Sequence, residues 1–186
     1  MKVQKQKPID YDSIGYGESN GWQPMYDWNK TKKVIIPGNI AVIVLVVTAM
    51  SFLTRQAGST FFVILSALAY FLVVIPIHEL LHLAACTPIV FSAKCHIFVG
   101  LSAVSAFYDG EIPRGRSLLS SILPFAAITV VLGLLGLIAR EIWVYAAIVA
   151  LLNAGGSWTD MLMFFHTLRH IPRNSIVYGN RCKVQE

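Results

Sequence analysis

Four long runs of apolar residues follow a polar N-terminal segment of 33 residues. The runs span residues 34–53, 60–85, 117–139 and 142–168. A helix needs about 20 residues to cross the roughly 30 Å hydrocarbon core of a bilayer. Each run is at least that long, so the pattern predicts four transmembrane helices.

The connection between the second and third runs has a different pattern. Residues 94–108 are rich in β-branched and aromatic side chains, and the turn pair Asp109-Gly110 follows them. Because unpaired strands cannot face lipid, these residues are expected in water or packed on protein. The predicted fold is an all-α membrane bundle of four transmembrane helices, with a short cytoplasmic β-hairpin between helices 2 and 3. Residues 34–173 form the membrane domain, between a polar cytoplasmic tail (1–33) and a second cytoplasmic tail (174–186).

Composition and charge agree with a membrane protein. Hydrophobic residues make up 55% of the chain and charged residues only 13%. The net charge is +5, and the basic residues lie mostly outside the apolar runs. They therefore indicate membrane orientation rather than nucleic-acid binding, and we expect no nucleic-acid partner. With the N-terminus inside, thirteen Lys and Arg residues lie on the cytoplasmic side and two, Arg55 and Arg140, on the other. The positive-inside rule therefore predicts a multi-pass protein of the cell membrane with both termini cytoplasmic.

Three cysteines and no C-x-x-C pair predict neither a disulfide framework nor a cysteine-rich zinc site. The polar first 33 residues predict no cleavable signal peptide.

The second apolar run ends in a metal-binding pattern. Residues His78-Glu79-Leu80-Leu81-His82 spell H-E-x-x-H. Positions four apart lie on one face of a helix, so both imidazoles can reach one ion. The glutamate beside the first histidine can then reach a water on that ion. Zinc suits the pattern because it accepts nitrogen and oxygen ligands and keeps an open fourth position.

Asp160 is the predicted third ligand. It and Glu79 are the two carboxylates outside the loops and tails. A charge in the middle of a membrane costs about 2.5–3.5 kcal/mol, so such residues rarely persist without a partner. In the predicted topology the second and fourth runs both start at the outer face. His78 and Asp160 each lie 18 residues into their run, at about 27 Å, which places them at similar depth near the inner boundary.

Two further residues leave alternatives open. Asn153 lies about two helical turns before Asp160 and is a candidate catalytic residue that donates a hydrogen bond to the developing oxyanion. Alternatively, it satisfies backbone groups freed by Gly155 and Gly156, two small residues that also suit close helix packing. Pro76 either kinks the helix and opens a water path to the metal, or is a tolerated irregularity.

The combination of H-E-x-x-H on one span with Asn153 and Asp160 on a later one resembles the site-2-protease type of intramembrane zinc peptidase. It is closer still to a small family of membrane proteins described as putative zincin peptidases. In that family a helix ending in His-Glu-Leu-x-His is followed by Asn-x-x-x-Ser/Gly-x-x-Asp. The resemblance covers residues 60–173.

The resemblance implies His78, His82 and Asp160 as zinc ligands and Glu79 as the catalytic residue. The site-2-protease pattern usually carries Leu-Asp-Gly, with a proline after the asparagine. Here Thr-Asp-Met stands at 159–161 and that proline is absent. This departure from the pattern counts against the oxyanion role of Asn153 more than against the metal role of Asp160.

The sequence therefore predicts a membrane-embedded zinc metallopeptidase that cleaves membrane-associated proteins or peptides near the cytoplasmic face. The alternative is a metal-binding membrane protein without protease activity: a scaffold, a degenerate enzyme or a carrier. A carrier needs ligands near the midplane of the bilayer, whereas these cluster at one face. A purely structural protein with a chance motif leaves the paired burial of Glu79 and Asp160 unexplained.

Overall fold

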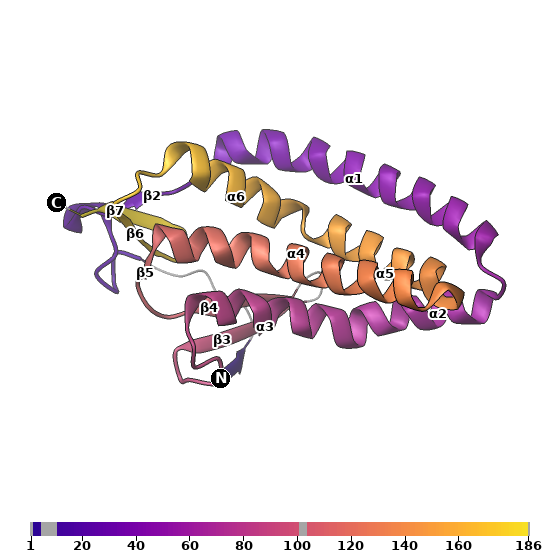
Figure 1. Cartoon of the computed structure of the whole chain (residues 1–186). Coiled ribbons are helices and arrows are strands. Elements are labelled where there is room, and N and C mark those ends of the chain that lie inside the picture. The colour runs from indigo at the N-terminus through magenta and orange to yellow at the C-terminus, as the bar shows by residue number, and fades with distance from the viewer. Residues whose placement is uncertain (1, 5–10, 101–103, 186) are drawn as a thin grey trace. The chain divides into compact units, whose positions relative to one another are not determined.

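The computed structural model describes residues 2–4, 11–100 and 104–185 (Figure 1). The chain divides into two compact units. The strand unit contains Met1–Trp28, Glu79–Leu123 and Leu162–Glu186, and the helical unit contains Asn29–His78 and Pro124–Met161. Three helices have several residues in each unit: α3 (Ile75–Cys86), α4 (Arg114–Ile138) and α6 (Trp158–His170).

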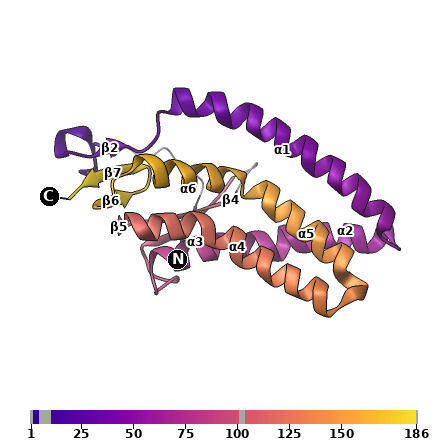
Figure 2. The same cartoon turned by 45° about the horizontal axis from the view of Figure 1, so that its top comes forward.

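The helical unit is built from long apolar helices. It contains α1 (Trp28–Gln56), α2 (Thr60–Ala69), the π turn η2 (Tyr70–Val74), the 3-10 turn η3 (Arg140–Ile142) and α5 (Trp143–Gly156). Helices α2 and α5 lie side by side in both views (Figure 1, Figure 2). Their contact buries Val63, Val144 and Ile148, against which Met50 and Leu53 of α1 also pack.

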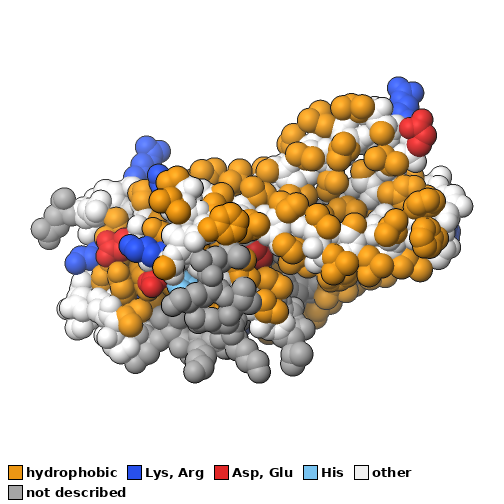
Figure 3. Space-filling view, turned by 90° about the horizontal axis from the view of Figure 1, so that it is seen from below, with side chains coloured by type: hydrophobic (Ala, Val, Ile, Leu, Met, Phe, Trp, Pro, Cys, Tyr) orange, Lys and Arg blue, Asp and Glu red, His pale blue; other side chains and the backbone are white. Residues whose placement is uncertain are grey.

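The helices fit a membrane protein. Three are long and apolar enough to cross a bilayer: Thr31–Gln56, Thr60–Cys86 and Arg114–Ile138. A fourth span is present if Arg140–Gly156 and Trp158–His170, which meet at a bend of 51°, are counted together. Hydrophobic side chains cover much of the helical surface seen in Figure 3. Exposed apolar surface of this extent is typical of contact with lipid.

The span that carries H-E-x-x-H contains an irregular turn just before Pro76. In η2 the Ile75 N–H bonds to the Tyr70 carbonyl, five residues earlier instead of four. Proline has no N–H, and its ring clashes with the carbonyl four residues before it in a regular helix. A π turn widens the helix at that point. The kink expected from Pro76 is therefore a widened turn within a span of 27 residues. That this turn opens a water path to the metal stays a prediction.

The last two helices break at Ser157. The Ser157 N–H and hydroxyl both donate to the Asn153 carbonyl in the last turn of α5, at 2.9 and 2.7 Å. A serine hydroxyl bonded to the carbonyl four residues earlier often bends a helix. Helix α6 restarts at Trp158 in a new direction. The fourth apolar run, predicted as one helix, therefore contains a sharp bend between two helices.

Gly155 and Gly156 permit close packing next to this bend. A Cβ on Gly155 would lie 2.9 Å from Val46 Cγ2 of α1, and one on Gly156 would lie 2.5 Å from the Tyr70 hydroxyl. Both distances are too short for ordinary contacts, so a side chain at either position would force its neighbour to move. The two glycines therefore have the packing role considered for them.

The strand unit holds two small sheets. One has the order β1-β3-β4 and the other β2-β7-β6-β5. Strands β3 and β4 are antiparallel, with Cys95 opposite Tyr108 and Val99 opposite Val104, and β1 pairs with β3 in parallel. The strands and the 3-10 turn of this unit are β1 (Lys2–Gln4), η1 (Glu18–Asn20), β2 (Gln23–Pro24), β3 (Cys95–Val99), β4 (Val104–Tyr108), β5 (Ile112–Pro113), β6 (Ser175–Tyr178) and β7 (Arg181–Val184).

The structure is mostly helical, as predicted, but it holds more strands than the single expected hairpin. Strands β3 and β4 lie within residues 94–108, where strands were expected, and residues 101–103 of the connection lie outside the described residues. The four-stranded sheet was not expected, because strands of two to four residues are too short to show an alternating pattern. It includes β6 and β7, which lie in residues 174–186, and β2, which lies in residues 1–33. Helix α1 also begins at Trp28, six residues before the predicted start at 34.

The four-stranded sheet has its own apolar and aromatic contacts. Met25, Ile171, Val177 and Cys182 form a buried cluster. The Tyr178 hydroxyl donates to Asp109 Oδ1 at 2.7 Å. Burial raises the pKa of Tyr178 and this hydrogen bond raises it further, because both favour the protonated phenol.

Candidate metal centre

Helix α3 brings the three residues of H-E-x-x-H together. The ligand atoms of His78, Glu79 and His82 all lie within 4.8 Å of one another. His78 and Glu79 are buried, and His82 is half-buried. The helical spacing places the two imidazoles on one face, so this group can hold a metal ion.

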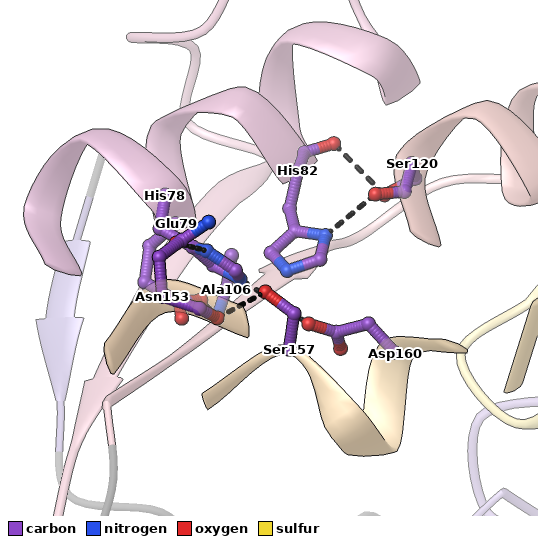
Figure 4. Close-up of polar contacts among 8 residues, drawn as sticks. All are labelled: His78, Glu79, His82, Ala106, Ser120, Asn153, Ser157 and Asp160. Atoms are coloured by element: carbon purple, nitrogen blue, oxygen red, sulfur yellow. Dashed lines mark hydrogen bonds and ion pairs between the residues drawn. The ribbon is translucent and has the colours of Figure 1, made fainter. Parts of the chain in front are cut away.

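In the helical unit, His78 has polar partners at both ring nitrogens (Figure 4). Its Nδ1 lies 3.1 Å from Asn153 Oδ1 of α5, and its Nε2 lies 3.2 Å from Asp160 Oδ2 of α6. The amide oxygen of Asn153 can only accept, so the Nδ1–H of His78 donates to it. The other nitrogen then faces a carboxylate oxygen that also only accepts. A metal cation at this position would satisfy both atoms.

The donor set fits zinc. Zinc binds imidazole nitrogen and carboxylate oxygen at about 2.0–2.2 Å, which places two ligands of a tetrahedral ion about 3.3–3.5 Å apart. The 3.2 Å between His78 Nε2 and Asp160 Oδ2 is close to that separation. A histidine ligand typically donates its second N–H to a nearby acceptor, as His78 does to Asn153.

The bend at Ser157 places Asp160 in the first turn of α6. The N-terminal end of a helix carries a partial positive charge, which favours a carboxylate there. The Asp160 side chain is 25% exposed and that of His78 11%, so the carboxylate is the more open member of the pair. Had α5 continued straight through residue 157, Asp160 would lack this favourable end position.

Asn153 is almost fully buried, with 1% of its surface exposed. Its Oδ1 accepts from His78, while its Nδ2 is buried with no hydrogen-bond partner among the described residues. The Asn153 carbonyl accepts from the Ser157 hydroxyl, and the Asn153 side chain bonds no backbone group among the described residues. The Asn153 side chain therefore bonds the His78 ring, and its Nδ2 carries two N–H donors that no described residue accepts.

In the strand unit, His82 is held by Ser120 of α4 (Figure 4). The His82 Nδ1–H donates to the Ser120 carbonyl at 2.7 Å, and the Ser120 hydroxyl donates to the His82 carbonyl at 3.0 Å. Ser120 could not be predicted from the sequence, because Ser117 and Ser121 lie in the same segment and no spacing marks one of the three.

Glu79 lies at a strand edge within the same unit. Its Oε2 accepts from the backbone N–H of Ala106 in β4, at 2.6 Å. Hydrogen bonds alternate along an antiparallel ladder. The Asp109 N–H, just after β4, points to the β3 side and bonds the carbonyl of Lys94, the residue before β3. The Ala106 N–H therefore points away from β3. The outer edge of β4 thus faces the glutamate of the motif, a contact that the sequence did not indicate.

Comparison with known proteins adds an independent finding. The model of the family described as "Putative zincin peptidase" matches residues 71–176, which is more than half of the chain and includes every candidate site residue. No curated protein and no solved structure matches the chain. The extent of the family match shows that the chain belongs to the putative zincin peptidase family.

Proposed function

We propose that the protein is a membrane-embedded zinc metallopeptidase that hydrolyses peptide bonds of membrane-associated proteins or peptides near the cytoplasmic face. One observation carries the proposal: His78 Nε2 faces Asp160 Oδ2 at 3.2 Å, next to the glutamate of H-E-x-x-H. The family and the long apolar helices support it. The cytoplasmic side follows from the distribution of Lys and Arg along the sequence.

The residues divide the chemistry between them. His78, His82 and Asp160 would hold the zinc. When bound, zinc supplies the positive charge that acidifies water and polarises the scissile carbonyl. Glu79 takes the proton of the attacking water and passes it to the leaving amine. Asn153 keeps the His78 ring in place and can donate from Nδ2 to the developing oxyanion.

The substrate is expected to bind in an extended form. A helical segment hides its carbonyls in its own hydrogen bonds and must unwind before cleavage. The outer edge of β4, where the Ala106 N–H meets Glu79, can pair with the unwound segment as an added strand. Peptide bonds in segments that unwind easily should therefore be cleaved first.

The test uses the purified full-length chain in lipid nanodiscs and two apolar helical peptides that differ at one central pair of residues. Replacing Ala-Ala by Gly-Gly weakens the helix by about 2 kcal/mol, so we expect cleavage of the Gly-Gly peptide to be about 30-fold faster. A chelator should abolish cleavage of both, and added zinc should restore it. Cleavage that persists after verified removal of zinc would contradict the proposal, and equal rates for the two peptides would contradict the unwinding step.

Substitutions at Asn153 separate its two proposed contributions. Leucine removes the acceptor for the His78 Nδ1–H, so we expect zinc affinity to fall about 10–100-fold. Aspartate keeps an acceptor but lacks the amide donors. Asn153→Asp should therefore bind zinc at least as tightly as the wild type, but lose about 100–1000-fold in kcat if Asn153 contacts the oxyanion. Competition with a chelating dye measures the affinity, and unchanged zinc affinity in Asn153→Leu would contradict the orienting role.

A further inference from the structure

Helix α4 contains a proline at a position that changes the hydrogen bonding of Ser120. Pro124 lies four residues after Ser120, inside the helix, and is fully buried. In a regular α-helix the N–H of residue 124 would donate to the carbonyl of residue 120. Proline has no N–H, so the Ser120 carbonyl lacks its regular helical partner. Ser120 is half-buried, and a carbonyl freed in this way is stabilised when another donor bonds to it.

The donor is the His82 ring. Its Nδ1 lies 2.7 Å from the Ser120 oxygen, which is a short hydrogen bond. The Ser120 hydroxyl in turn donates to the His82 carbonyl at 3.0 Å, so two hydrogen bonds join Ser120 and His82. The carbonyl that Pro124 releases is therefore the acceptor that holds the imidazole.

This contact decides which ring nitrogen of His82 can bind a metal. A carbonyl oxygen only accepts, so the proton of the neutral ring lies on Nδ1. The lone pair is then on Nε2, the nitrogen opposite the hydrogen bond. Histidine ligands of metals commonly donate their second N–H to a backbone carbonyl in this manner.

We propose that Pro124 is a positioning residue of the metal centre: by freeing the Ser120 carbonyl, it holds His82 in the tautomer that presents Nε2 to zinc. This inference rests on the proposed function, because it takes His82 as a zinc ligand. Restoring an N–H at position 124 would return the Ser120 carbonyl to the helix ladder and make it compete with His82. His82 would then lose its preferred tautomer and orientation.

The experiment compares Pro124→Ala with two controls in full-length protein in lipid nanodiscs. Ile128→Ala removes buried packing one turn further along α4 but leaves the backbone N–H groups unchanged. Ser120→Ala removes the hydroxyl and keeps the carbonyl. Zinc affinity, measured by competition with a chelating dye, should fall about 10–100-fold in Pro124→Ala and clearly less in both controls. A matching loss in Ile128→Ala would show that packing is responsible and would overturn the proposal.

A second measurement does not depend on how the variant folds. In the zinc-free wild type, ¹⁵N NMR of the His82 ring should show the proton on Nδ1. A proton on Nε2 would overturn the inference even if Pro124→Ala fails to fold. If the wild type binds zinc and Pro124→Ala binds it equally well, the positioning role fails while the proposed function stands. If the wild type binds no zinc, the proposed function itself fails.

Discussion

Replacing Glu79 with glutamine is expected to stop peptide hydrolysis while zinc stays bound. The amide has nearly the same shape and can still accept the hydrogen bond from the Ala106 N–H, so the strand contact is kept. It cannot take a proton from water. General acid–base catalysis contributes about 100–10,000-fold, and a loss of at least this size is expected in kcat. The rate is measured with the Gly-Gly peptide, and zinc content is measured on the same sample.

Glu111→Gln is the matched control, because Glu111 is an exposed carboxylate of the same unit. It should cleave at the wild-type rate. Two results would count against the assignment of Glu79. Wild-type activity in Glu79→Gln would mean that another group accepts the proton. Loss of zinc in Glu79→Gln would make Glu79 a ligand, a role its closeness to both histidines permits.

Replacing Asp160 with alanine is expected to have the largest effect on metal binding. It removes the anionic group that faces His78 Nε2 at 3.2 Å. Loss of a group that only supports a ligand typically costs about 10–100-fold in affinity, and loss of a ligand should cost more than about 100-fold. Zinc at 100 times its dissociation constant stabilises a folded protein by about 2.7 kcal/mol. Asp160→Ala should therefore lose most of the zinc-dependent rise in melting temperature.

Thr159→Ala is the control for this substitution, because Thr159 is the neighbouring residue on α6 and offers no carboxylate. It should keep the zinc-dependent rise. An undiminished rise in Asp160→Ala would show that the residues of α3 hold the metal without Asp160. The third ligand would then be a different residue.

Much of the candidate site could be predicted because helices have a constant rise and period. The four-residue spacing of His78 and His82 places them on one face whatever surrounds the helix. The equal distances of His78 and Asp160 from the starts of their spans indicated similar depth, and the structure places their side chains in contact. Both spacings are independent of how distant parts of the chain pack.

The remaining contacts depend on packing that no local pattern encodes. The proline at 124 is visible in the sequence and frees a carbonyl, but the rotation of α4 that turns this carbonyl toward His82 is not. The segment 94–108 indicated strands without indicating which edge would face Glu79. The spacing of Asn153 and Asp160 suggested a shared face, yet did not show that the Asn153 oxygen binds His78.

The short strands of the four-stranded sheet were missed for a related reason. Strands β6 and β7 have four residues each and are joined by Gly179, whose φ of 55° is a turn conformation. Four residues are too few for alternation to stand out from a polar tail. Their stability comes from the buried cluster that Met25 of the N-terminal segment forms with Val177 and Cys182, a contact between opposite ends of the chain.

The most direct test of the central claim is the X-ray absorption spectrum at the zinc edge of the purified full-length protein. The account predicts one zinc per chain, with nitrogen and oxygen ligands at about 2.0–2.1 Å and the outer-shell scattering of two imidazoles. Chains that hold no zinc, or a zinc with sulfur ligands at about 2.3 Å, would contradict it.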